Sequence, residues 1–186
     1  MSGGLPDFGT YAPVLSALIA KTKGPILELG SGDHSTPLLH LVSDCCGREV
    51  VTAETDPVWL SKYENYRTSL HSLHLITKNP TKGAEVHQWQ AGWDEWKEIE
   101  KRQWSVALID QAPGECRAST IRRLKGRCEY IVAHDSEKDY DVGTNYGYEA
   151  VIPLFKHVWE WRRFRPYTLV LSDQEIFGFQ DLAWKP

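Results

Sequence analysis

The chain has 186 residues, a hydrophobic fraction of 41% and a formal net charge of −4. This length is enough for one compact domain with its own core, and the composition excludes a disordered chain. The weak negative charge gives no sign of a surface built to coat nucleic acid or an anionic membrane. We therefore expect residues 1–186 to form a single folded domain.

Neither the cysteines nor the hydropathy pattern indicates export or membrane insertion. Cys45, Cys46, Cys116 and Cys128 form no CxxC pair and have no histidine at metal-ligand spacing, which is typical of reduced thiols. Residues 1–8 lack the basic and apolar regions of a signal peptide, and no apolar run approaches the roughly 18 residues that span a bilayer. We expect a cytoplasmic protein with no membrane partner. The sequence leaves the oligomeric state open, a homodimer included.

The first half of the chain alternates between segments typical of helices and short apolar segments typical of strands. A hydroxyl at Ser35 followed closely by Pro37 indicates a helix start, and Gly47 suits the end of that helix. Helices are predicted at 11–21, 35–47 and 56–63, and strands at 26–29, 50–53 and 73–76. Strands that alternate with helices imply a parallel sheet covered on both faces.

The second half of the chain continues the alternation of strands and helices and then ends in two consecutive predicted strands. Strands are predicted at 105–109 and 130–133 with a helix at 119–124, whereas 79–92 is expected to be a loop with one short strand. A polar loop at 136–145 and a helix at 148–161 are expected next, followed by strands at 167–171 and 175–179 joined by a short turn. A short turn forces antiparallel pairing. The expected fold is an α/β, Rossmann-like three-layer sandwich whose mostly parallel sheet ends in an antiparallel hairpin.

The residues that follow the first two strands indicate an adenosine cofactor. Gly30 and Gly32 allow a tight turn and the close approach of a ligand to the backbone. Glu54 follows the glycines by about 20 residues, at the end of the second strand, where a carboxylate can accept both hydroxyls of a ribose. Ligands of open α/β sheets bind at this edge of the sheet. The alternative is an ordinary tight turn beside a capping glutamate.

The neighbours of the glycine turn favour S-adenosylmethionine (SAM) over a dinucleotide. A dinucleotide site carries a third glycine at the position that Ser35 holds here, and Glu28 and Asp33 would repel a pyrophosphate. SAM has no phosphate and carries a sulfonium and an ammonium, so acidic neighbours favour its binding. A nicotinamide-binding Rossmann domain is the disfavoured alternative.

Two segments resemble known motifs. Ile26-Leu-Glu-Leu-Gly-Ser-Gly32 resembles the first motif of the class I SAM-dependent methyltransferases, and Ala53-Glu-Thr-Asp-Pro57 resembles their acidic second-strand motif. The resemblance implies a seven-stranded sheet whose last pair is a reversed hairpin. It also implies that Glu28 lies near the methionine end of the cofactor, that the two glycines lie under it and that Glu54 holds the ribose.

The family often has an acid after the third strand that binds the adenine amine. Here that position is Thr77-Lys-Asn-Pro80, and Trp93 and Asp94 are the expected substitutes, with a core role as the alternative for Trp93. The full set of expected cofactor contacts is Glu28, Gly30, Ser31, Gly32, Ser35, Glu54, Thr55, Trp93, Asp94 and Asp110. Residues 108–117, 131–137 and 167–172 are further similar to short methyltransferase-like proteins of bacteria and phages.

Acidic and imidazole side chains end the fourth and fifth strands, which border the methyl-transfer site in this fold. His134 is the expected general base, Asp110 is expected to position the acceptor or bind the methionine ammonium, and Asp135 completes the predicted catalytic set. Asp110 and Asp135 are also candidate Mg²⁺ ligands, with Glu137 as a third, although the expected cofactor is SAM alone. The alternative is that the two acids cap the segments that follow.

The expected acceptor is a small molecule, methylated at oxygen. Residues 111–114 occupy the place of the Asp/Asn-Pro-Pro-aromatic motif of amine-directed methyltransferases and match it poorly. The tyrosine-rich loop at 137–148 is expected to close over the acceptor, with Gly143 and Gly147 as hinges. A nucleic-acid acceptor is an alternative, as is a protein that binds or cleaves SAM without methyl transfer. The phosphate contacts for nucleic acid would be Arg117, Arg122, Arg123, Lys125, Arg127, Arg162, Arg163 and Arg165.

Overall fold

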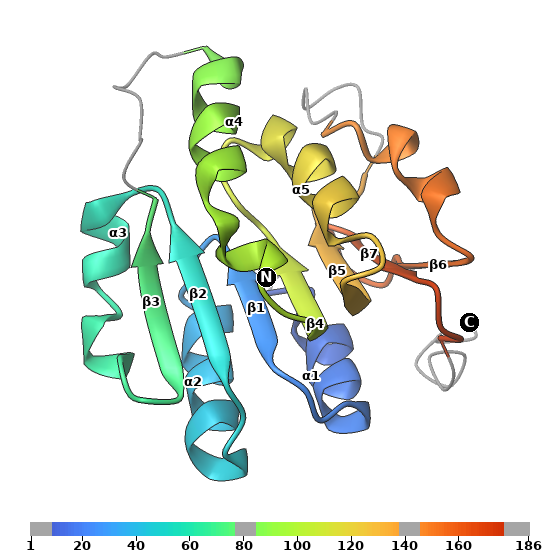
Figure 1. Ribbon diagram of the computed structural model, residues 1–186. Coiled ribbons are helices and arrows are strands. Elements are labelled where there is room, and N and C mark those ends of the chain that lie inside the picture. The colour runs from blue at the N-terminus through green and yellow to red at the C-terminus, as the bar shows by residue number, and fades with distance from the viewer. Residues whose placement is uncertain (1–8, 77–84, 138–145, 177–186) are drawn as a thin grey trace, which may run out of the picture.

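Seven short segments, most of them rich in Val, Ile and Leu, pair into one sheet in the order β3-β2-β1-β4-β5-β7-β6 (Figure 1). The structure, a computed structural model, describes residues 9–76, 85–137 and 146–176. The strands are β1 (Ile26–Leu29), β2 (Val50–Glu54), β3 (His71–Leu75), β4 (Trp104–Ile109), β5 (Cys128–His134), β6 (His157–Trp161) and β7 (Thr168–Ser172). The first five strands pair in parallel, and β7 pairs antiparallel with β5 and β6. This confirms the predicted Rossmann-like sandwich with a mostly parallel sheet and an antiparallel pair at its end.

Local signals fix where several helices begin and end. The Asp56 carboxylate caps α3 by accepting hydrogen bonds from the backbone N–H groups of Val58 and Trp59. Gly47 ends α2 in the left-handed conformation, at a φ of 64°. His34 holds the cap position of α2, so Ser35 is the first helical residue and not the predicted cap. The helices are α1 (Ala12–Lys21), α2 (Ser35–Cys46), α3 (Pro57–Ser61), α4 (Val86–Glu95) and α5 (Arg117–Leu124), with 3₁₀ turns η1 (Glu64–Tyr66), η2 (Lys97–Glu100), η3 (Gly114–Cys116), η4 (Tyr148–Ala150) and η5 (Ile152–Leu154).

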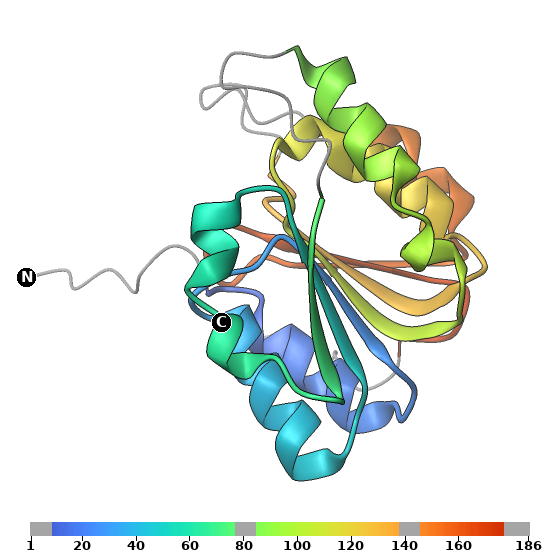
Figure 2. The same cartoon turned by 60° about the vertical axis from the view of Figure 1, so that its left-hand side comes forward.

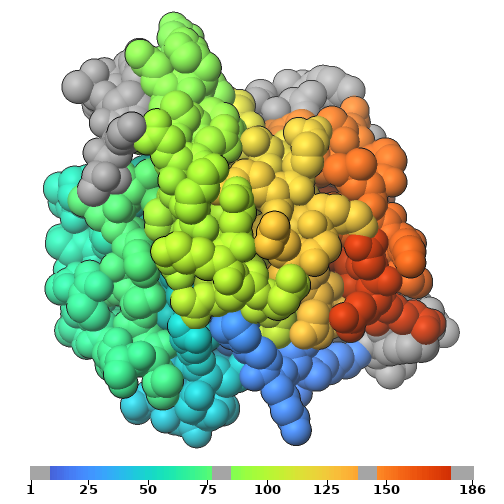
Figure 3. Space-filling view, viewed as in Figure 1, coloured from blue at the N-terminus to red at the C-terminus, as the bar shows by residue number. Residues whose placement is uncertain are grey.

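Helices cover both faces of the sheet. α1 and α2 lie on one face, and α4 and α5 lie on the other, as two views of the ribbon show (Figure 1, Figure 2). From the α4 side, α4, η2 and α5 together cover the middle of the sheet (Figure 3). In the part of the chain that the structure describes, no helix has the length and apolar composition to cross a bilayer. The four cysteines are free thiols, as predicted.

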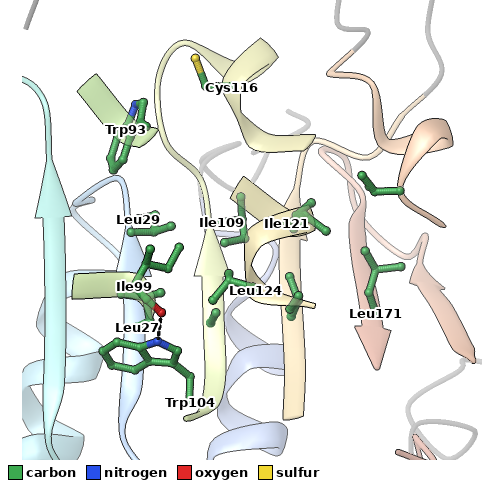
Figure 4. Close-up of a cluster of buried hydrophobic side chains, with 14 of the residues drawn as sticks. Leu27, Leu29, Trp93, Ile99, Trp104, Ile109, Cys116, Ile121, Leu124 and Leu171 are labelled. Atoms are coloured by element: carbon green, nitrogen blue, oxygen red, sulfur yellow. Dashed lines mark hydrogen bonds between the residues drawn. The ribbon is translucent and has the colours of Figure 1, made fainter. Parts of the chain in front are cut away.

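Alternate residues of the buried strands supply two separate cores. Leu27 and Leu29 pack with Trp93 and Trp104 on the side of α4 and α5 (Figure 4). Ile26 packs with α1 on the opposite side. All four residues of β1 are buried because a central parallel strand is covered on both faces. The remaining residue of β1, a glutamate, therefore lies in an interior where a charge needs partners.

The predicted helix at 148–161 is wrong. The segment forms the single turns η4 and η5 and then the edge strand β6. Pro153 has no N–H with which to continue a helix, and the aromatic and β-branched residues that follow it favour a strand. The antiparallel pair of the sheet is therefore β6 with β7, and the predicted strand at 167–171 is its second member and not its first.

Two further predicted segments differ from the structure. At 175–179, Glu175 and Ile176 belong to no strand, and the rest of that prediction lies outside the described residues. At 79–92, the structure has no strand among the residues it describes, because α4 begins at Val86 with a capping box formed by Glu85 and Gln88.

The carboxyl ends of the central strands lie level with one another. Leu29 of β1 is opposite both Ala53 of β2 and Ile109 of β4, and Ile109 is opposite Ala133 of β5. Open α/β sheets bind their ligands at this edge. The next residues along these four strands therefore form one row at the edge: Gly30, Glu54, Asp110 and His134.

Arg48 joins three elements at the opposite edge of the sheet. Its buried guanidinium donates to the carbonyl oxygens of Ile19, Thr22 and Gly24 and to the hydroxyl of Ser105. We expect Arg48→Met to lower the free energy of unfolding by about 3 kcal/mol or more, because several buried oxygens lose their donors. Urea unfolding followed by circular dichroism measures this loss.

Arg67→Met is the matched control for that prediction. Arg67 pairs with the exposed Glu64, where an ion pair contributes about 1 kcal/mol or less, and donates one further hydrogen bond to the carbonyl oxygen of Leu73. Equal losses in the two variants would contradict the role of Arg48 as a buried link between α1, the segment before β1, and β4.

Candidate functional site

The glycine turn after β1 passes directly over the loop after β4. Gly30 has a φ of +90°, and a Cβ at this position would lie 2.4 Å from the carbonyl oxygen of Asp110. Its own N–H donates to the carbonyl oxygen of Ala53. Gly30 is therefore required by the contact between two backbone segments, in addition to any approach of a ligand.

Glu54 lies beside this turn with both carboxylate oxygens bound. Oε2 accepts hydrogen bonds from Ser31 N at 2.9 Å and Ser31 Oγ at 3.1 Å. Oε1 accepts from Thr55 N at 2.6 Å, Thr55 Oγ1 at 3.2 Å and Asp56 N at 3.0 Å. Three predicted cofactor residues thus meet at one point. The hydroxyls of Ser31 and Thr55 thus bind the carboxylate, one on each oxygen.

The helix α3 and the residues just after it hold the outer side of the glycine turn. Trp59 Nε1 donates to the carbonyl oxygen of Ser31 at 2.6 Å, and Tyr63 Oη donates to Asp33 Oδ1 at 2.6 Å. Burial and the nearby Asp33 raise the pKa of Tyr63 well above its ordinary range, so it stays a donor. The sequence predicts a helix that contains Trp59 and Tyr63 after the second strand, with no indication that they belong to the site.

Glu28 is fully buried between β2 and α2. Thr52 Oγ1 donates to its Oε2 at 2.6 Å, and Thr36 Oγ1 lies 3.0 Å from the same oxygen. Thr36 Oγ1 also accepts from Gly32 N, so the carboxyl group supports the turn through one hydroxyl. Burial raises the pKa of Glu28 to about 7, although the hydrogen bonds of the threonines oppose the shift. Ser35, at the start of α2, is buried next to it.

This burial predicts that Glu28→Gln removes a pH dependence of stability. Between its ordinary pKa of 4.5 and its folded pKa of about 7, Glu28 keeps a proton that it loses on unfolding. Stability from this group is therefore present below pH 4.5 and falls as the pH rises to 7, by roughly 3 kcal/mol in all. Urea unfolding at pH 5 and pH 8 should show that the wild type loses about this much more than the variant.

The comparison with the variant is needed because His71 acts in the opposite direction. Burial lowers the pKa of His71 from 6.5 to about 4, so its contribution to stability rises with pH in that window. The difference between wild type and Glu28→Gln removes this contribution. The same pH dependence in both proteins would show that Glu28 does not titrate in the folded state as described.

The predicted adenine contacts already have partners within the protein. Trp93 is 1% exposed within the core, and its indole N–H donates to the carbonyl oxygen of Ala112 at 3.4 Å. Asp94 accepts from Gln90 on the same helix and lies 3.8 Å from Arg123. The structure therefore supports the core role for Trp93 and not the contact with adenine. The stretch at 77–80, where the family carries its adenine acid, lies outside the described residues.

A cluster of three predicted catalytic residues lies at the ends of β4 and β5: Asp110, His134 and Asp135. Arg117 forms hydrogen bonds with all three. Arg117 Nη2 donates to Asp110 Oδ1 and Nη1 donates to Asp135 Oδ2, each at 2.8 Å. Nη1 also donates to the carbonyl oxygen of His134, and Nε donates to that of Gln111. Burial alone lowers the pKa of Arg117, but Tyr148, Asp110 and Asp135 outweigh it and raise that pKa above its ordinary range. From the sequence, Arg117 is expected only as one of several candidate phosphate contacts.

His134 is 2% exposed, and both of its ring nitrogens face acceptors. Thr10 Oγ1 donates to the carbonyl oxygen of Pro166, so His134 Nε2 is the donor in its 3.1 Å bond to Thr10. Nδ1 lies 3.3 Å from Asp110 Oδ1 and 3.5 Å from Asp135 Oδ1. A general base needs a free nitrogen, so this arrangement favours a positioning role over the predicted base.

The C-terminal end of the tyrosine-rich loop rests on this cluster. The Tyr146 ring stacks on the Arg117 guanidinium at 4.6 Å and lies so close to Gly114 that a Cβ there would clash with the ring. Tyr148 Oη donates to the carbonyl oxygen of His134 at 2.8 Å. Residues 138–145, which include the predicted hinge Gly143, lie outside the described residues.

Many of the basic residues proposed as phosphate contacts are already paired. Arg117 is buried, Arg123 binds Glu100, Lys125 binds Asp173 and Arg162 binds Glu160. An arginine held by an acid has fewer donors for a phosphate. Three of these partly exposed basic side chains, those of Arg123, Lys125 and Arg162, therefore already have acidic partners.

Comparison with known proteins identifies the fold. No protein-family model matches the sequence, and no curated protein sequence matches it. Human methyltransferase-like protein 13, solved with S-adenosylhomocysteine (SAH), is 13% identical with a TM-score of 0.62, over 96% of this chain and 88% of that one. The METTL16 methyltransferase domain is 17% identical with a TM-score of 0.57 (94% and 71%), and a human methyltransferase 10 domain containing protein is 15% identical with a TM-score of 0.54 (92% and 84%). The chain has the fold of the class I SAM-dependent methyltransferases, as predicted.

Proposed function

We propose that this chain transfers a methyl group from SAM to an acceptor. The observation that carries the proposal is the placement of Glu54, with one replaceable hydroxyl on each carboxylate oxygen, beside the turn at Gly30. Glu54 would hold the ribose, and Ser31 and Thr55 would release their hydroxyls to it. The acidic side chains of Asp33 and Asp110 beside the same turn suit a cationic cofactor.

In this proposal the protein aligns the acceptor with the methyl group, and the chemistry is an in-line displacement at the methyl carbon. Asp110 Oδ1 accepts bonds from Arg117 and faces His134, whereas Oδ2 has no hydrogen bond among the described residues. Oδ2 is therefore the oxygen that can accept from the acceptor hydroxyl or the methionine ammonium. His134 would serve as the base only after losing its contact with Thr10 or Asp110.

We propose a small molecule, methylated at oxygen, as the acceptor. Paired basic residues on α5 weigh against a phosphate surface at that helix. Residues 111–114 depart from the amine-directed motif, which favours oxygen. The half-buried ring of Tyr146, beside Arg117 at the edge of the site, suits a small planar or sugar-like acceptor.

A nucleic acid is the second candidate acceptor. The catalytic domain of human METTL16, at 10% identity and a TM-score of 0.53, was solved in complex with an RNA hairpin from the MAT2A 3′UTR. That complex shows that a protein with this fold binds RNA, which keeps the alternative open for experiment.

Transfer of tritium from methyl-labelled SAM distinguishes the two acceptors. The purified protein is incubated with labelled SAM and with two fractions of a cell extract, its small molecules and its nucleic acids, with the Glu54→Gln variant as control. We expect label in the small-molecule fraction that depends on Glu54. Label that precipitates with nucleic acid and disappears on nuclease treatment would support the second candidate, and no transfer to either fraction would count against methyl transfer.

A further inference from the structure

The guanidinium of Arg117 lies between two acids at the point where a divalent cation would bind. Asp110, His134 and Asp135 each offer a ligand atom, and these atoms lie within 4.8 Å of one another, as in a metal site. Arg117 places one nitrogen 2.8 Å from an oxygen of each acid. Its positive charge thus compensates the same carboxylates that a metal would need.

Arg117 is fixed in this position from several sides. Two further donors go to the backbone carbonyl oxygens of Gln111 and His134, and the ring of Tyr146 covers the guanidinium at 4.6 Å. Its side chain is 7% exposed. A planar fork with five donors can bridge two carboxylates and two carbonyls at once, which a hydrated ion could do only after the guanidinium had left.

The backbone at Asp135 is consistent with this arrangement. Asp135 has a φ of 55°, a left-handed conformation that non-glycine residues rarely adopt outside special sites. The turn brings the Asp135 carboxylate and the carbonyl oxygen of His134 to the same guanidinium nitrogen, Nη1. Tyr148 binds that carbonyl oxygen from the other side.

We propose that Arg117 is the resident cation of this site, a positioning residue that fixes Asp110 and Asp135 at the ends of β4 and β5 and excludes a divalent metal. Acceptor binding at Asp110 is then independent of metal, and the free oxygen Oδ2 keeps one orientation. The part about the acceptor rests on the proposed function, whereas the exclusion of metal does not. Removing the guanidinium should convert the cluster into a metal site.

Titration of the full chain with Mn²⁺, followed by electron paramagnetic resonance of the free ion, tests this inference. We expect no saturable binding by the wild type up to about 1 mM, and one site in Arg117→Met with at least tenfold higher affinity. The site should disappear in the double variant Arg117→Met/Asp135→Asn. Arg123→Met, on the same helix, is the matched control and should gain no site.

Arg117→Lys covers the case in which Arg117→Met does not fold. A lysine keeps the charge on a single nitrogen and cannot bridge both acids as a fork, so we again expect at least a tenfold gain in Mn²⁺ affinity over the wild type. A wild-type protein that already binds one Mn²⁺, lost in Asp135→Asn, would overturn the inference, as would the absence of any gain in the folded Arg117 variant. Binding of SAH, measured on the same samples, separates a failure of this inference from a failure of the proposed function. Absence of SAH binding would count against the proposed function alone.

Discussion

Replacing Glu54 by glutamine is expected to weaken SAH binding at least tenfold and to lower the free energy of unfolding by roughly 2–4 kcal/mol. Both effects have one physical cause. The buried carboxylate accepts five hydrogen bonds from Ser31, Thr55 and Asp56, and a glutamine keeps one acceptor oxygen while turning an NH₂ group toward donors. Calorimetry measures the affinity, and urea unfolding measures the stability.

A pair of adenosine analogues separates ribose binding from a general loss of structure. Adenosine carries the two ribose hydroxyls, and 2′,3′-dideoxyadenosine lacks them. If Glu54 holds the ribose, the wild type should prefer adenosine and Glu54→Gln should lose most of that preference. An unchanged preference in the variant would show that Glu54 supports the turn without touching the ribose.

Replacing Gly30 by alanine is expected to cost about 3 kcal/mol or more of stability and to abolish measurable SAH binding. The φ of +90° is costly for any residue with a Cβ, and that Cβ would lie 2.4 Å from Asp110 O and 2.8 Å from Gln111 N. These are backbone atoms, so no rotation of a side chain relieves the contact. The turn and the loop after β4 must move apart, which separates the two halves of the proposed cofactor site.

Gly47→Ala is the control for Gly30→Ala. Gly47 also has a positive φ, of 64°, but a Cβ there would meet nothing within 4 Å. It should therefore lose only the cost of the left-handed conformation, about 1–2 kcal/mol, and keep its affinity for SAH. Equal losses at the two glycines in urea unfolding would mean that the close contact between Gly30 and Asp110 is absent.

Sequence alone predicted the sheet and its ligand edge because their signals are local. The glycine turn, the acid at 54 and the cap at Asp56 each follow a short buried strand, and each is visible within a few residues. The C-terminal segment carried a conflicting signal. The spacing of residues at 148–161 predicts a helix, but Pro153 interrupts it and the residues that follow pair with β7 as strand β6. This pairing depends on the tertiary structure and is not visible in the local sequence.

The remaining features of the site depend on contacts between distant parts of the chain. Thr10 binds His134 across 124 positions, and Arg117 joins the ends of two strands, so neither role follows from spacing. Trp93 was a candidate ligand contact because tryptophans suit both cores and binding sites. In the structure Trp93 is buried under the loop after β4, which supports a role in the core and not in ligand binding.

Calorimetric titration of the purified chain with SAH, SAM and NAD tests the central claim most directly. We expect saturable binding of one SAH and one SAM per chain and no binding of NAD. The reason is that Glu28, Asp33 and Ser35 disfavour a pyrophosphate at the glycine turn. Heat from NAD alone, or no binding of either adenosyl compound, would contradict this claim.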